Sequence, residues 1–178
     1  MDKHIVICGR RHVGKTTLVN HLMEQIRVPV YGFQTSTVLE DADGTHHIYM
    51  YPAGQVDGHM EEANHIGDCD TRNRTVNPSV FDSLGVELIK AARPGGIIVM
   101  DEIGFMETGS QRFCDAVLEA LDGEIPVLAT VKDTELGAEF LDKVRQHPRA
   151  ELIMMTAENR EETARRAEDM LRRRSLLK

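Results

Sequence analysis

Short apolar segments alternate with segments of helical periodicity along the chain. Apolar and β-branched runs predict strands at residues 4–8, 28–35, 46–51, 96–100, 125–131 and 151–155. Apolar residues at helical spacing, and a final charged segment, predict helices at residues 14–25, 78–92, 110–121, 140–146 and 158–178. This alternation is typical of an α/β protein, so we expect a mostly parallel central sheet with helices on both faces, in three layers.

Residues 52–77 interrupt the alternation. They are polar, contain Gly54, Gly58 and Gly67, and show little periodicity. We therefore predict a long mobile loop or lid in this range. The chain has no internal repeat and no low-complexity linker, so we expect residues 1–178 to form one domain.

The segment Gly9-Arg-Arg-His-Val-Gly-Lys-Thr16 satisfies the pattern G-x-x-x-x-G-K-[ST], between a predicted buried strand and an amphipathic helix. Its glycines allow the backbone to wrap closely around a phosphate, and the helix N-terminus adds partial positive charge. We expect Lys15 to contact the β- and γ-phosphates as a catalytic group, and the Thr16 hydroxyl to ligate Mg²⁺. The predicted nucleotide-binding residues of this segment are Gly9, Arg10, Arg11, His12, Val13, Gly14, Lys15, Thr16 and Thr17.

A second motif, Ile97-Ile-Val-Met-Asp-Glu102, places two acids at the end of an apolar strand. Open α/β sheets bind ligands at this edge. We expect Asp101 to hold Mg²⁺, and Glu102, turned the other way by strand alternation, to act as the base that activates water. Thr130 ends another apolar strand, where it either approaches the γ-phosphate or simply packs in the sheet.

With both motifs in place, Asp101-Glu-Ile-Gly-Phe-Met-Glu107 resembles the DEIGxME segment of the thermophile-type, or cancer-related, nucleoside-triphosphatase family. Tyr31–Thr35, Pro126–Val131 and Thr156–Arg160 are similar to further segments of that family, in the same order. The resemblance implies a P-loop NTPase fold of the additional-strand type, with adjacent Walker B aspartate and glutamate. It also implies Mg²⁺-dependent hydrolysis of ATP, GTP and other nucleoside triphosphates to diphosphate and phosphate. Asn159 and Arg160 are then further nucleotide-binding candidates.

The sequence departs from the family at two places. Arg11-His12 stand where the family commonly has Pro-Gly, and residues 52–74 have no convincing counterpart. Two other functions therefore stay open: a small-molecule or nucleotide kinase, and a nucleotide-binding adaptor of the molybdopterin-cofactor type with little turnover. Arg72 and Arg74 are either arginines that reach the transferred phosphoryl group or part of a solvated turn.

Composition and charge limit the kinds of partner and setting that we expect for this chain. Hydrophobic residues make up 41% of the chain and charged residues 28%, and the formal net charge of −8 makes nucleic acid an unlikely partner. The absence of a long apolar run excludes a membrane-spanning helix, and the three separated cysteines favour a reducing, cytoplasmic setting. The sequence points to no particular protein partner. His46, His47, His59, His65 and Cys69 match no compact zinc pattern, so we interpret the histidines as exposed loop residues.

Overall fold

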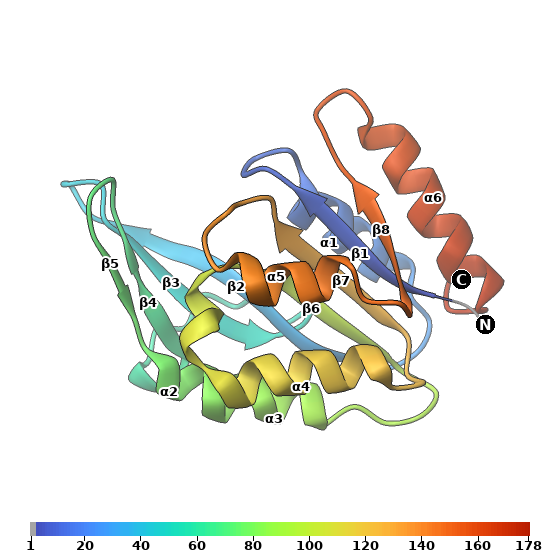
Figure 1. Cartoon of the computed structure of the whole chain (residues 1–178), viewed down its shortest axis with the longest axis horizontal. Helices are drawn as coiled ribbons and strands as arrows, with labels where there is room; N and C mark the ends of the chain where they lie inside the picture. The colour runs from blue at the N-terminus through green and yellow to red at the C-terminus, as the bar shows by residue number, and fades with distance from the viewer. Residues whose placement is uncertain (1–2) are drawn as a thin grey trace.

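The computed structural model describes residues 3–178, which form an eight-stranded sheet with helices on both faces (Figure 1). The strand order is β5-β4-β3-β2-β6-β7-β1-β8. The strands are β1 (His4–Gly9), β2 (Val30–Glu40), β3 (His46–Pro52), β4 (His65–Cys69), β5 (Arg74–Val76), β6 (Ile97–Ile103), β7 (Val127–Lys132) and β8 (Ala150–Met154).

The sheet has a parallel part and an antiparallel part. The β2-β6-β7-β1-β8 strands are parallel neighbours, whereas β3, β4 and β5 pair antiparallel and extend the sheet beyond β2. One strand, β7, lies between β1, which leads into the phosphate-loop sequence, and β6, which carries Asp101 and Glu102. This inserted strand confirms the expected P-loop fold of the additional-strand type.

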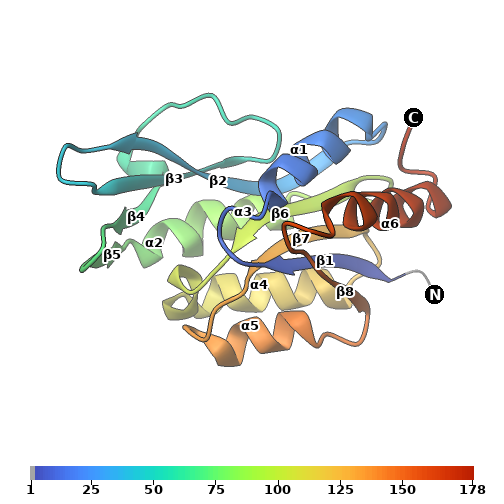
Figure 2. The same cartoon turned by 90° about the horizontal axis from the view of Figure 1, so that it is seen from above.

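The helices form two layers, which Figure 2 shows from above. The helical segments are α1 (Lys15–Gln25), η1 (Glu62–Asn64), α2 (Pro78–Val80), η2 (Phe81–Gly85), α3 (Val86–Lys90), η3 (Met106–Gly109), α4 (Gln111–Asp122), α5 (Ala138–Arg145) and α6 (Arg160–Arg173). One face of the sheet packs against α1 and α6, and the other against α2 to α5. Within residues 3–178, no helix has the length and apolar character needed to cross a bilayer.

Strand alternation divides the core between these layers. In β1, Ile5 and Ile7 pack in the α1/α6 cluster, whereas Val6 between them packs in the opposite cluster. All three are at most 2% exposed. Because both faces are covered, the parallel strands consist largely of apolar residues, and each fully buried aliphatic side chain contributes about 1.5–3 kcal/mol.

The range 52–77, predicted as a long mobile loop or lid, contains regular secondary structure that the sequence analysis did not predict. Two strands, β4 and β5, lie within it and pair antiparallel next to β3. They are five and three residues long, and only Ile66 and Gly67 of β4 are buried. Strands this short and this polar produce no alternation that a sequence window can detect, because their stability comes from pairing with β3.

Two of the predicted helices also differ from the structure. The helix expected at residues 78–92 contains a π-helical segment, η2, between α2 and α3, and ends at Lys90. The final helix ends at Arg173 rather than continuing to residue 178. The chain then turns back, so that Leu176 and Leu177 are buried and Leu177 bridges to Ile26 after α1. Burial of these two leucines favours the turn over further helix.

Candidate active site

The phosphate-loop residues connect β1 to α1, as predicted. Gly9 lies so close to the end of β8 that a Cβ atom there would approach the Met155 carbonyl oxygen to 2.6 Å. Gly14 caps α1 in the left-handed region, with φ of 106°. His12 also has positive φ, 65°, at the position where the resembled family commonly has glycine. The loop therefore adopts a backbone that glycine favours, and His12 accommodates it.

Lys15 lies at the centre of this loop, although only 6% of it is exposed. Its ammonium donates to the carbonyl oxygens of Gly9 and Arg10, both at 2.8 Å, and forms an ion pair with Glu102 Oε2 at 2.8 Å. The structure thus brings the two predicted catalytic residues into direct contact. The ammonium is held by two neutral acceptors and one anion, in a position from which it can exchange Glu102 for another anion.

A β-bulge places the two acids of β6. Met100 pairs with Ala129 and Ile103 with Val131, so Asp101 and Glu102 together face the single residue Thr130. Bulges re-aim side chains. Strict alternation predicted that Asp101 and Glu102 point in opposite directions, but both carboxylates reach α1: Asp101 contacts Thr16 and Glu102 contacts Lys15. The bulge is the physical reason for this difference.

Asp101 is buried and accepts hydrogen bonds from three neutral groups. Thr16 Oγ1 donates to Oδ1 at 3.2 Å, Thr130 Oγ1 donates to Oδ1 at 2.6 Å, and Gln34 Nε2 donates to Oδ2 at 3.2 Å. Burial raises the pKa of Asp101 above its ordinary value, while these donors act in the opposite direction. Thr130 is itself fully buried, so its hydroxyl positions Asp101, and neither interpretation made from the sequence was complete.

Gln34 connects this carboxylate to two other parts of the chain. Its Nε2 also donates to Asn20 Oδ1 at 2.9 Å, and its Oε1 accepts from the Gly54 N–H at 2.9 Å. In β2, Gln34 is the direct register partner of Asp101. Sequence reasoning missed Gln34 and Asn20, because Gln34 begins a run of polar residues in β2 and nothing in that run marks it as buried.

The oxygen atoms at Thr16 and Asp101 fit a magnesium ion. Magnesium prefers oxygen ligands and is usually held by one or two carboxylates or hydroxyls together with water and phosphate oxygens. The Thr16 hydroxyl and Asp101 Oδ1 are 3.2 Å apart, and Thr16 is exposed to solvent. A cation would also compensate the buried charge of Asp101, whose three hydrogen-bond partners are neutral.

Glu102 lies on the wall of a cavity of about 400 Å³, formed mainly by the phosphate loop. The lining residues are Arg11, His12, Gly14, Lys15, Thr16, Thr17, Thr37 and Glu102. A second cavity of about 170 Å³ also includes Glu102 and continues toward β3 and β4 through Thr35, Ile48 and Cys69. Glu102 therefore lines both cavities, which share three further lining residues, Arg11, Thr16 and Thr37.

Basic side chains surround the second cavity. Lys132 Nζ lies 3.8 Å from Glu102 Oε1 and 5.1 Å from the centre of the Phe105 ring. The Arg74 guanidinium lies over the same ring at 4.6 Å. Sequence reasoning missed Lys132, although a lysine directly after an apolar strand lies at the ligand-binding edge. Arg74 lies beside this cavity, whereas Arg72 is exposed in the turn between β4 and β5.

Asn159 and Arg160 lie at the start of α6, on the other side of the loop. The Asn159 side chain accepts a hydrogen bond from the Thr156 N–H at 2.8 Å and donates one to the Met154 carbonyl at 2.8 Å. These two hydrogen bonds hold the connection between β8 and α6. Arg160 Nε donates to the Val13 carbonyl oxygen at 2.7 Å. Arg160 also lines a mostly apolar cavity of about 450 Å³ with Leu18, His21 and Met155.

Comparison with known proteins shows to which family the chain belongs. A family model described as NTPase matches residues 4–167. The chain belongs to this NTPase family. The match spans the phosphate loop, both acids of β6 and Arg160.

Individual relatives cover nearly the same range. The NTPase described here is 32% identical to nucleoside-triphosphatase THEP1 of Methanocaldococcus jannaschii, over 88% of this chain and 90% of the relative. It is 30% identical to a cancer-related nucleoside-triphosphatase homolog of Bos taurus, over 90% of this chain and 92% of the relative. The crystal structure of THEP1 from Aquifex aeolicus superposes with a TM-score of 0.72, at 26% identity, covering 94% of this chain and 98% of that one.

One further acid of this NTPase lies close to the site. Glu107 is 3% exposed, and the Gly104 N–H donates to its Oε2 at 3.0 Å. Burial raises the pKa of Glu107 from 4.5 to about 7. A carboxyl group whose pKa is raised in the folded state binds more protons there than in the unfolded state between these two values. The free energy of unfolding therefore falls as the pH rises from about 4.5 to about 7.

We expect Glu107→Gln to remove this loss, because the amide keeps an oxygen acceptor for Gly104 and does not ionise. The pKa shift corresponds to about 3 kcal/mol. The free energy of unfolding of the variant should therefore exceed that of the parent by up to about this amount at pH 8 and equal it near pH 4.5. Urea unfolding of both proteins at the two pH values measures the difference. Glu139→Gln, at an exposed acid of α5, is the control. A parent-minus-variant difference that is independent of pH would contradict the expectation.

Proposed function

We propose that this NTPase hydrolyses nucleoside triphosphates, ATP and GTP among them, to nucleoside diphosphate and phosphate, with Mg²⁺ as its cofactor. The observation that carries the proposal is the contact between Lys15 and Glu102 at 2.8 Å in the mouth of the phosphate loop. A base for water and a cation for phosphate then lie side by side. The names of the relatives support the same reaction.

The phosphate loop and Lys15 bind the triphosphate in this proposal. Backbone N–H groups at the start of α1 face the phosphates, and the helix dipole favours their charge. Thr16 and Asp101 hold the metal, while Thr130 and Gln34 fix the orientation of Asp101. When bound, Mg²⁺ would supply charge neutralisation of the phosphate oxygens.

Glu102 accepts the proton of the attacking water. In the nucleotide-free protein its carboxylate is paired with Lys15. An incoming γ-phosphate is a stronger partner for the ammonium, because it carries more charge and several acceptor oxygens. Lys15 therefore turns from Glu102 to phosphate, which leaves the carboxylate available to water. Lys132, whose ammonium lies 3.8 Å from the other carboxylate oxygen, holds Glu102 near this position.

Arg160 and the cavity of about 450 Å³ beside it accept the nucleoside in this proposal. The cavity adjoins Gly14 and Thr17 on the side away from Glu102, so a phosphate chain in the loop would direct its nucleoside there. Asn159 holds the β8–α6 connection in place through its hydrogen bonds. Arg160 stabilises the phosphate loop through its hydrogen bond to the Val13 carbonyl oxygen.

Phosphate release from each common nucleoside triphosphate, with and without Mg²⁺, tests the proposal. We expect release in the absence of any added acceptor and loss of release when the metal is removed with a chelator. Consumption of triphosphate that requires a hydroxyl acceptor would instead indicate a kinase. Tight binding with no phosphate release would indicate an adaptor.

A further inference from the structure

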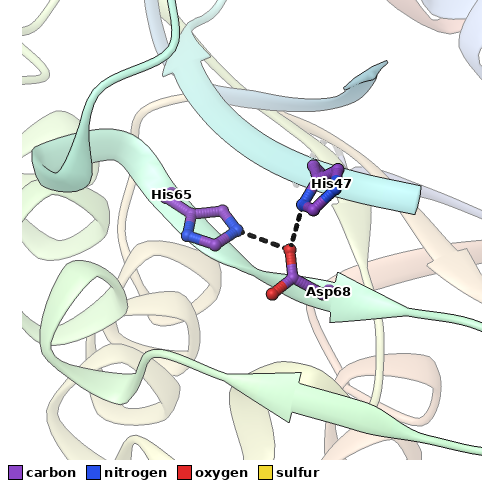
Figure 3. A group of neighbouring side chains, drawn as sticks. All are labelled: His47, His65 and Asp68. Carbon is purple, nitrogen blue, oxygen red and sulfur yellow. Dashed lines mark hydrogen bonds and ion pairs between the residues drawn. The ribbon is translucent and has the colours of Figure 1, made fainter. Parts of the chain in front are cut away.

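Two histidines and one aspartate meet on the antiparallel part of the sheet, as Figure 3 shows. His47 Nδ1 lies 2.6 Å from Asp68 Oδ1, and His65 Nε2 lies 2.8 Å from the same oxygen. The three ligand-type atoms all lie within 4.8 Å of one another. A single carboxylate oxygen is thus shared by two imidazole nitrogens.

Strand register brings the three residues together. His47 of β3 is the direct partner of Asp68 of β4. A register shift between Ile48 and Tyr49 places His65 opposite Tyr49, and the rings of Tyr49 and His65 are 4.9 Å apart. The sequence spacing predicted exposed loop histidines with no ligand pattern, but His47 and His65 lie in paired strands and are half-buried. Spacing along the chain carries no information on contacts made across a sheet.

We propose that His47, His65 and Asp68 bind one divalent transition-metal ion of the Zn²⁺ class. Two imidazoles and one carboxylate are a ligand set that such ions prefer, with at least one position left for water. Tetrahedral ligands at about 2.0–2.2 Å from zinc are about 3.3 Å apart. The observed distances of 2.6 and 2.8 Å to Asp68 Oδ1 are shorter than this by about 0.7 and 0.5 Å, so an outward movement of that size by these partly exposed side chains admits the ion.

The surrounding groups complete the site. His47 Nε2 lies 2.9 Å from Asp41 Oδ2, so with Nδ1 on the ion the Nε2–H donates to a carboxylate. Thr75 Oγ1 donates to Asp68 Oδ2 at 3.0 Å, which leaves Oδ1 for the ion. Metal-bound histidines typically make this second hydrogen bond, which fixes the tautomer and the ring orientation. On binding, the ion takes the place of the protons that the two imidazole nitrogens share with Asp68 Oδ1. A doubly protonated imidazole, such as a His47 that donates to both Asp41 and Asp68, then releases one proton to solvent, whereas a neutral imidazole keeps its proton on the other ring nitrogen.

The position of the site suggests what it does. Side chains alternate between the faces of a strand, so the neighbours His46, Ile48 and Cys69 point away from the cluster. They line the cavity of about 170 Å³ that also contains Glu102. A metal ion that links β3 to β4 would therefore hold one wall of that cavity. Mg²⁺ favours oxygen ligands, so this site and the oxygens of Thr16 and Asp101 select different ions.

Titration of the full chain with ZnCl₂ tests the proposal. The protein is first treated with a chelator, and the calorimetric titration is run in excess Mg²⁺, which occupies oxygen sites. We expect one Zn²⁺ per chain, with release of protons, and at least about a 100-fold loss of affinity in His47→Asn and in His65→Asn. Asp68→Asn, which keeps an acceptor for Thr75, should weaken binding as well.

A matched control is available in His59→Asn. His59 also contacts an aspartate, Asp57, but lies outside the cluster, so its loss should leave Zn²⁺ affinity unchanged. Circular dichroism melting of each variant without metal shows that it is folded. Absence of Zn²⁺ binding by the parent, or parent-like affinity in the folded His47→Asn and His65→Asn variants, would overturn the proposal. Loss of Zn²⁺ binding in Asp101→Asn with retention in the histidine variants would place the ion at the nucleotide site and overturn it equally. No turnover is measured, so the result is independent of the proposed hydrolysis.

Discussion

Glu102→Gln should lower the rate of phosphate release by about 10²–10⁴-fold, which is the range that a general base contributes. The amide keeps the length and shape of the side chain but does not accept a proton at neutral pH. Nucleotide affinity should stay at the parent value or rise. In the parent, a triphosphate must displace the Lys15–Glu102 ion pair of 2.8 Å, and in the variant the ammonium faces only a neutral amide.

Single-turnover phosphate release and equilibrium binding of a non-hydrolysable triphosphate separate these two effects. Glu119→Gln, at an exposed acid of α4 far from the loop, controls for the loss of a surface charge. Parent-like turnover in Glu102→Gln would show that Glu102 is not the base. Equal losses of binding and turnover would show that it acts on the nucleotide itself.

Local features of the chain could be predicted from its sequence. The phosphate loop and the strand before Asp101 depend on residues that are neighbours in the chain: an apolar run, a glycine at each turn and a following helix. These features singled out Lys15, Thr16, Asp101 and Glu102, and the structure brings Thr16 into contact with Asp101 and Lys15 into contact with Glu102. The same local pattern also predicted the parallel sheet, because strands such as β1 and the first part of β6 are buried on both faces and are therefore runs of apolar residues.

Contacts that depend on sheet register could not be predicted. Thr130 and Gln34 reach Asp101 from 29 and 67 positions away along the chain. The bulge that turns Glu102 toward Lys15 arises from the pairing of β6 with β7, which no single segment encodes. The short strands β4 and β5, which set Arg74 beside the active-site cavity, were missed for the same reason. In each case the feature is stabilised by contacts with a partner strand that is distant in the sequence.

Lys15→Met should weaken both nucleotide binding and hydrolysis. Methionine fills the space of the lysine stem, which is almost fully buried, and removes the ammonium. A hydrogen bond to a charged group contributes about 1.5–3 kcal/mol, so triphosphate affinity should fall by about 10- to 100-fold. The charge on the phosphate oxygens is redistributed in the transition state, where loss of one fixed donor typically costs about 10²–10³-fold in rate.

The same variant also tests the exchange of partners that the structure implies. In the parent, Lys15 is shared between the Gly9 and Arg10 carbonyls, Glu102 and, in our proposal, the γ-phosphate. If Lys15 and Glu102 act through each other, the double variant Lys15→Met/Glu102→Gln should lose less activity than the two single variants predict. Its fold-loss in rate should be well below the product of the two single fold-losses. Arg27→Met, at an exposed cation that contacts the Ser175 carbonyl near the C-terminus, is the matched control. Strict multiplicativity of the two losses would show that the ion pair is only a resting contact, whereas a double variant no slower than Glu102→Gln would show that the lysine acts chiefly by releasing the base.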